Sequence, residues 1–189
     1  MPIPGAGEDR RFTYEDYLTW PSKPRYELVG GVAHMLAFPS SKYQETLMEL
    51  AYYIRGGLGE SNCRVYAAPM DLCFEESPAA EDVVQPDLFV MCGSYRTGPR
   101  IIGVPVWIVE ILSLSTASYD KIAKMDRYQR AGIQEYWIVD PLNRVMDVFL
   151  HDGEHLVFRR AYGPDDEASP LMRPGLTIPL KQIFPSPPA

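Results

Sequence analysis

Apolar positions along this 189-residue chain follow two spacings, one typical of helices and one of strands. Between residues 41 and 56, the helical spacing i, i+3, i+4 and i+7 is filled by Leu47, Leu50, Ala51 and Ile54. This spacing predicts an amphipathic helix that ends at Gly56-Gly57. A second helix is predicted over residues 118–131, ending at Gly132. A short third helix is predicted to begin at Thr13, its N-cap, with Asp16 three residues on.

Shorter β-prone runs predict a larger number of strands. They cover residues 25–29, 32–37, 63–67, 70–74, 87–91, 106–111, 135–139, 145–150, 155–160 and 176–179. Gly30-Gly31 between the first two runs predicts a hairpin, and Asp152-Gly153 predicts another turn. Strands outnumber helices, which predicts an α/β or α+β fold: a mixed β-sheet flanked by helices, with extra β-hairpins.

The composition fits one globular domain, with 46% apolar and 23% charged residues. We predict a flexible N-terminus over residues 1–12, a single domain over 13–183 and a Pro-rich tail over 184–189. The net charge of −7 counts against a protein that holds nucleic acid by bulk electrostatics. Cys63, Cys73 and Cys92 lack CxxC spacing and are interpreted as reduced thiols. The sequence has no apolar run long enough for a membrane span and no signal core. These features predict a cytoplasmic location and no membrane partner.

Two carboxylates interrupt runs that otherwise predict buried strands. Asp87 precedes Leu-Phe-Val-Met, and Glu110 follows Val-Trp-Ile-Val. A buried carboxylate is costly unless a cation or hydrogen bonds compensate it. Mg²⁺ is one such cation, and a lysine is another. Lys124 lies on the predicted helix that follows Glu110, so the three residues supply the parts of a metal-dependent phosphodiesterase.

Several segments in a fixed order also carry a family resemblance. RYELVGG, QPDLFV, WIVEILSLST and YDKIAKMDRYQRAGIQEYWIVDP resemble the bacterial restriction endonuclease-like family of the PD-(D/E)XK nuclease superfamily. The resemblance covers residues 13–183, and its most specific part runs from Glu110 to Pro141. It implies a restriction-endonuclease-like fold, hydrolysis of DNA phosphodiester bonds with Mg²⁺ or Mn²⁺, and action as a homodimer. No protein partner is indicated.

The resemblance also assigns roles to individual residues. Asp87 corresponds to the metal-binding Asp, Glu110 to the second acidic residue, and Glu27 to a Glu that completes the metal site. The carbonyl of Ile111 is implied as a further ligand. Together with Lys124, which orients or activates the water, Glu27, Asp87 and Glu110 form the expected catalytic set.

This sequence departs from the family pattern at four positions, one of which is Leu114, where the family's SPST has Pro and this chain reads SLST. The superfamily motif places its lysine two residues after Glu110, where this chain has Leu112. Lys124 matches the position that the family uses instead, on the next helix. The family usually has an acidic residue at Gly30 and often a His near Tyr43.

The same helix carries a basic run of Lys121, Lys124, Arg127 and Arg130. Beside an acidic metal site, this run predicts a surface that faces phosphate. The helical period also places Tyr128 on the face of Asp120 and Lys124. We therefore expect Lys121, Arg127 and Tyr128 to bind the substrate.

Each of these residues has a structural alternative. Asp87 can cap neighbouring backbone, Glu110 can form an ion pair with Lys124 or Arg127, and Glu27 can pair with Arg25 or Lys23. Lys124 can be a solvated lysine, Asp120 a helix-start carboxylate, and Tyr136-Trp137 part of the core rather than a base-stacking platform. Two other functions stay open. One is a catalytically silent nucleic-acid-binding or interaction protein that keeps the fold. The other is a metal-dependent hydrolase of another phosphate ester.

Overall fold

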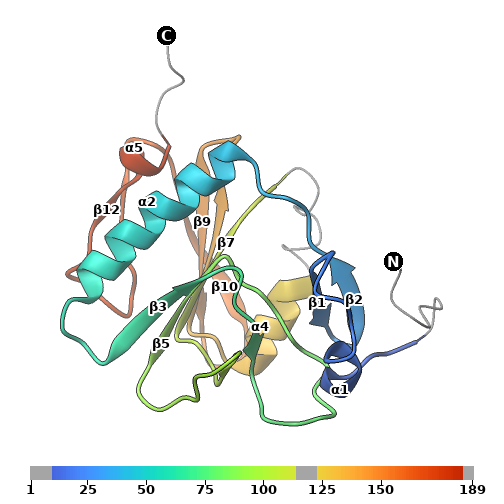
Figure 1. Cartoon of the computed structure of the whole chain (residues 1–189). Helices are drawn as coiled ribbons and strands as arrows, with labels where there is room; N and C mark the ends of the chain where they lie inside the picture. Colours follow the sequence, from blue (N-terminus) through green and yellow to red (C-terminus); the bar gives the residue numbers. More distant parts are fainter. Residues whose placement is uncertain (1–9, 114–122, 185–189) are drawn as a thin grey trace.

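A six-stranded mixed sheet forms the centre of the computed structural model, which describes residues 10–113 and 123–184 (Figure 1). In spatial order its strands are β10 (Leu156–Tyr162), β9 (Val145–His151), β8 (Glu135–Asp140), β7 (Trp107–Ile111), β5 (Leu88–Cys92) and β3 (Cys63–Ala67). Within this sheet β7 and β8 are parallel, and the other neighbours are antiparallel. The predicted mixed sheet with flanking helices is confirmed.

Two helices cover opposite faces of the sheet (Figure 1). The buried residues of α2 (Ser41–Leu58) pack with Trp107 and Trp137, while Tyr128 of α4 (Met125–Ala131) packs with Phe89 and Tyr136. Alternate residues of a strand face opposite sides, so a strand covered on both sides needs a continuous apolar run. Full burial of one large apolar side chain contributes roughly 1.5–3 kcal/mol. Tyr136 and Trp137 are therefore core residues, as the structural alternative predicted.

The N-terminal part of the described chain forms a hairpin beside the sheet. Strands β1 (Tyr26–Val29) and β2 (Val32–Met35) pair around Gly30-Gly31, as predicted. Both glycines have positive φ angles, 56° and 76°, which two-residue hairpin turns of this type require. The backbone of Leu28 exchanges hydrogen bonds with Val83, so the hairpin is attached to the segment that leads into β5.

Helix α1 (Tyr14–Tyr17) begins as the sequence predicts. The Thr13 side chain accepts a hydrogen bond from the Asp16 N–H, and the Asp16 carboxylate accepts one from the Thr13 N–H. These two bonds satisfy amide groups that the first helical turn leaves without partners.

Several short elements differ from the predicted ones. Strands β4 (Leu72–Cys73) and β12 (Ile178–Pro179) are shorter than the runs over 70–74 and 176–179. Strands β6 (Ile101–Ile102) and β11 (Glu167–Ala168) and helix α5 (Leu180–Ile183) were not predicted. Elements this short are fixed by pairing and packing, because two to four residues carry no recognisable periodicity.

The interpretation of all three cysteines as reduced thiols is wrong. Cys63 and Cys92 lie opposite each other in the β3–β5 register and are joined by a disulfide, while Cys73 is a free, buried cysteine. Their separation of 29 residues gave no hint of pairing, because only the strand register brings them together.

The helix predicted over residues 118–131 is described from residue 123 onward and ends at Gly132, as predicted. Asp120 and Lys121 lie outside the described residues. In the described part of the chain, no helix combines the length and apolar character needed to cross a membrane.

Candidate active site

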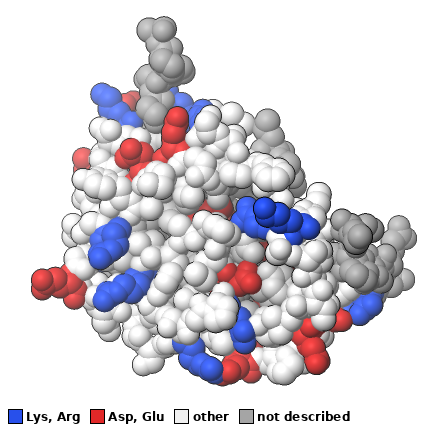
Figure 2. Space-filling view, viewed as in Figure 1, with Lys and Arg blue, Asp and Glu red and all other residues white. Residues whose placement is uncertain are grey.

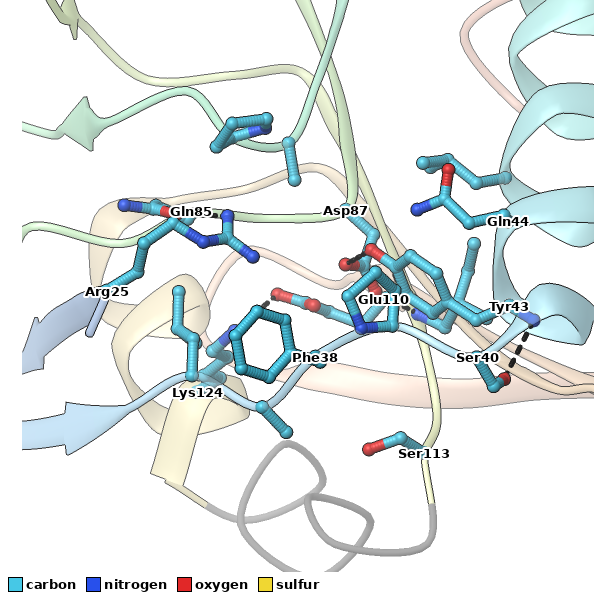
Figure 3. Close-up of a pocket in the computed structure, with 17 residues that line it drawn as sticks. Arg25, Phe38, Ser40, Tyr43, Gln44, Gln85, Asp87, Glu110, Ser113 and Lys124 are labelled. Atoms are coloured by element: carbon cyan, nitrogen blue, oxygen red, sulfur yellow. Dashed lines mark hydrogen bonds and ion pairs between the residues drawn. The ribbon is translucent and has the colours of Figure 1, made fainter. Parts of the chain in front are cut away.

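Asp87 and Glu110 meet at one end of the central sheet. Asp87 directly precedes β5, and Glu110 lies in β7. The antiparallel pairing of Leu88 with Val109 places the two acidic residues across from each other. Both line a pocket of about 300 Å³ at the N-terminal end of α2 (Figure 3). The predicted adjacent strands are confirmed as β5 and β7, with Asp87 one residue before β5 rather than within it.

Lys124, at the beginning of α4, reaches the carboxylate of Glu110. Its Nζ atom lies 3.1 Å from Oε1 of Glu110 and 3.1 Å from Oε2 of Glu27, which β1 supplies. All three side chains are buried, with exposed fractions of 3% or less. Lys124 is therefore a buried ammonium group between two glutamates, and its interpretation as a solvated helix lysine is wrong.

Two tyrosines donate hydrogen bonds to the two pocket carboxylates. The Tyr128 hydroxyl lies 2.6 Å from Oε1 of Glu110, and the Tyr43 hydroxyl donates to Oδ1 of Asp87. Burial, followed by the neighbouring Asp87 charge, raises the pKa of Tyr43. Burial, followed by the Glu110 charge, raises the pKa of Tyr128. Both hydroxyls stay protonated at neutral pH and act as donors to carboxylates.

The second oxygen of Asp87 contacts the backbone. Its Oδ2 atom accepts a hydrogen bond of 2.6 Å from the Ile111 N–H. The structural alternative for Asp87, a carboxylate that caps neighbouring backbone, is thus observed alongside its place in the pocket. The same bond fixes the end of β7 against the start of β5. Ligation by the Ile111 carbonyl stays a prediction.

A polar network that the sequence did not indicate reaches the pocket at Gln85 and Arg25. The Gln85 N–H donates to Oε2 of Glu27 (3.2 Å), and the Gln85 side-chain amide donates to Asp71 (2.8 Å). Arg25 in turn donates to the side-chain oxygen of Gln85 at 3.2 Å. Gln85 thereby connects Glu27 to Arg25, which also lines the pocket.

Two carboxylates, rather than three, are placed in the pocket to bind a divalent cation. Asp87 and Glu110 line the pocket, whereas Glu27 is not among its lining residues and contacts Lys124. Across residues 10–113 and 123–184, no group of three or more His, Cys, Asp or Glu side chains is placed to hold a metal ion. Mg²⁺ prefers oxygen ligands and retains several waters, so two carboxylates are a sufficient protein contribution.

The expected substrate-binding residues do not lie in this pocket. Tyr128 is completely buried and bonds Glu110, so it cannot touch a substrate. The guanidinium of Arg127 forms an ion pair with Asp82 through three hydrogen bonds, with distances of 2.5, 2.9 and 3.0 Å. These two assignments are corrected: both residues hold the structure around the site. Lys121 lies outside the described residues.

The helix-borne basic run is therefore not a single phosphate-facing surface. Arg130 pairs with Asp126 one turn away at 3.1 Å, and Lys124 is directed inward to the two glutamates. A helical period places residues on one face of a helix, but contacts with neighbouring elements decide which of them remain exposed.

A mixed sheet with helices on both faces and acidic residues at the end of its central strands defines the restriction-endonuclease-like class. Four solved chains match this fold. One is a crystal structure of a putative nuclease belonging to DUF820 from Anabaena variabilis, with a TM-score of 0.73 and 19% identity. The match covers 92% of this chain and 97% of that one.

A match to a family model identifies the family. The model of the Uma2 family, described as putative restriction endonuclease, matches residues 14–181. The chain therefore belongs to the Uma2 family, and the predicted resemblance is confirmed. No curated protein matches the chain.

Proposed function

We propose that this protein is a metal-dependent endonuclease that hydrolyses DNA phosphodiester bonds. One observation carries the proposal: Asp87, Glu110 and Lys124 line the same pocket. Two carboxylates and one ammonium group at a single pocket are the side chains that phosphodiester hydrolysis needs. Membership of the Uma2 family, whose description is a nuclease, supports the same reaction class.

Asp87 and Glu110 are the residues that would hold Mg²⁺ or Mn²⁺. The bound ion supplies a Lewis acid that polarises the phosphate and lowers the pKa of a water. Lys124 provides a fixed positive charge beside the phosphate, where negative charge develops during hydrolysis. Glu27 and Glu110 keep this ammonium group in position, and Tyr43 keeps Asp87 in one rotamer. Glu27 thus positions Lys124, and a role as an outer metal ligand remains part of the proposal.

A cleavage assay tests the proposal directly. We expect purified protein to cut plasmid or single-stranded DNA with Mg²⁺ or Mn²⁺ and not with EDTA. Asp87→Asn and Glu110→Gln should each lower the rate by about 100-fold or more. Glu49→Gln, an exposed carboxylate on α2, is the matched control and should keep full activity. Activity that survives in both Asp87→Asn and Glu110→Gln contradicts the assignment.

A catalytically silent DNA-binding protein is the second candidate. The contact of Lys124 with both Glu27 and Glu110 favours it, because the ammonium group already balances charge that a metal would otherwise balance. Calorimetry with Mn²⁺ separates the two functions. The nuclease binds Mn²⁺ and loses this binding in Asp87→Asn, whereas the silent protein binds DNA without taking up the metal.

Two finer points belong to the same proposal. A panel of phosphate monoesters and diesters separates a DNA nuclease from a hydrolase of another phosphate ester. By resemblance to restriction-type nucleases that cut both strands, we also propose a homodimer, which sedimentation velocity checks.

A further inference from the structure

Phe38 is a large apolar side chain in an unusual place. It lies in the segment between β2 and α2, is 100% exposed, and lines the pocket that holds Asp87 and Glu110. In Figure 3 its ring projects over the space between Glu110 and Lys124. A fully exposed phenylalanine gains nothing from core packing, and its position beside a polar pocket leaves the ring available to a partner with a flat, apolar face.

Arg25 lines the same pocket and carries a positive charge. Its hydrogen-bond partner is the neutral amide of Gln85. Within the described part of the chain, no ion pair is formed by Arg25. A guanidinium held by a neutral amide keeps its charge and its remaining donors for an anion such as phosphate.

A second hollow adjoins the first across the Arg25–Gln85 pair. It has a volume of about 340 Å³ and shares Arg25 and Gln85 with the pocket. Trp20, which is partly exposed, lines this second hollow. An aromatic residue, an arginine and another aromatic residue therefore follow one another across the two hollows. Alternating stacking surfaces and positive charge are characteristic of sites for single-stranded nucleic acid.

We propose that the pocket takes an unpaired nucleotide of single-stranded DNA, with Phe38 stacked on its base and Arg25 bound to a phosphate. The strand continues into the hollow lined by Trp20. This inference rests on the nuclease function proposed above and specifies its substrate. A pocket of about 300 Å³ is the size of a small-molecule site, which suits one nucleotide and is far too narrow for a duplex.

The net charge of the protein also favours single-stranded DNA over a duplex. Duplex binding without base contacts depends on many Lys and Arg contacts to phosphate. This chain has a net charge of −7, and the face seen in Figure 2 shows basic and acidic side chains interspersed. Stacking does not need a broad basic surface, so an exposed aromatic ring is an effective means for an acidic protein to hold DNA.

Binding is measured by fluorescence anisotropy with a labelled oligothymidine and with a duplex of the same length, in EDTA and again in Ca²⁺. We expect the wild type to prefer the single strand by about 10-fold or more. Phe38→Ala should weaken single-strand binding by about 10-fold, and Phe38→Trp should restore it. Phe158→Ala removes another exposed phenylalanine, on β10, and is the matched control. An oligonucleotide with 2-aminopurine should lose fluorescence on binding the wild type and not on binding Phe38→Ala.

The outcomes separate this inference from the nuclease proposal. Single-strand binding that depends on Phe38, without cleavage in Mg²⁺ or Mn²⁺, supports the inference and refutes the nuclease. Cleavage that depends on Asp87 and Glu110 but is unchanged in Phe38→Ala supports the nuclease and overturns the inference. Equal affinity for duplex and single strand, or no single-strand binding under either condition, also overturns it. Phe38 has no buried surface, so unchanged thermal unfolding of Phe38→Ala is expected.

Discussion

Replacing Lys124 with methionine should destabilise the protein strongly, because its ammonium group contacts two buried carboxylates. With Nζ 3.1 Å from each glutamate, the attraction is about 5 kcal/mol per pair at an effective dielectric constant of 20. Desolvation of the three charges offsets much of this attraction. Removal of one partner from a buried ion pair typically costs 3–5 kcal/mol. We therefore expect Lys124→Met to lower the free energy of unfolding by about 4 kcal/mol at pH 7.

Urea denaturation of four variants tests this reasoning. Lys124→Met is compared with Lys181→Met, an exposed lysine on α5 that should change stability by less than about 0.5 kcal/mol. The double variant Lys124→Met/Glu27→Gln removes one of the two carboxylates and should recover about 1–2 kcal/mol relative to Lys124→Met. Glu27→Gln alone completes the cycle. A loss below about 1 kcal/mol in Lys124→Met, or a double variant no more stable than Lys124→Met, refutes the buried triad.

Three further predictions use other contacts of the site and the core. Tyr43→Phe removes the hydroxyl that orients Asp87, so the affinity for Mn²⁺ measured by calorimetry should fall by about 10-fold. Tyr52→Phe, on the exposed side of α2, is the control and should keep the wild-type affinity. Arg127→Gln breaks the ion pair with Asp82 and should cost about 2 kcal/mol of stability in urea without raising KM for DNA. A raised KM instead would return Arg127 to the substrate-binding set. Burial raises the pKa of Glu135 from 4.5 to about 7, so the unfolded state loses its proton first. The stability of the wild type relative to Glu135→Gln should then fall by about 3 kcal/mol as pH rises from 4.5 to 7, and a constant difference contradicts the shift.

The regular elements were predictable because each carries its own pattern. The spacing of Leu47, Leu50 and Ile54 predicted α2, whose buried face includes all three. The continuous apolar runs around Glu110 predicted strands buried on both faces. Strands that follow one another in the sequence commonly pair, so the predicted strands also gave the neighbouring positions of Asp87 and Glu110.

The contacts that shape the site were beyond the sequence, since they depend on how elements cross. Tyr43 reaches Asp87 because the first turn of α2 lies beside the start of β5. Gln85 connects Glu27 to Arg25 only through the attachment of β1 to the segment before β5. Periodicity places a residue on a face of its own element, but it does not say which residue of another element lies opposite. The exposed Phe38 had no signal either, because a single aromatic residue between two elements has no pattern.

The carboxylate of Asp82 lies beside Arg127, where an acidic side chain at position 30 would also begin. The Gly30 N–H donates to Oδ1 of Asp82, and a side chain at Gly30 would begin 3.5 Å from the guanidinium of Arg127. Asp82 holds that same guanidinium with three hydrogen bonds. An acidic residue at position 30, which the family resemblance implies, would begin beside the guanidinium of Arg127. Here Asp82 supplies the carboxylate from another segment, which leaves a glycine free to adopt the positive φ of the turn.

The departure at Leu112 is explained in the same way. Leu112 is buried in the apolar cluster on the α4 side of the sheet, and its N–H donates to the carbonyl of Val139 at 2.8 Å. A lysine at this position would place its charge among apolar side chains, at a cost that only an ion pair could offset. Lys124 instead approaches from α4 and places its Nζ atom against Glu110. The site therefore retains an ammonium group beside its second acidic residue, although the sequence position of the lysine has moved by 12 residues, from 112 to 124.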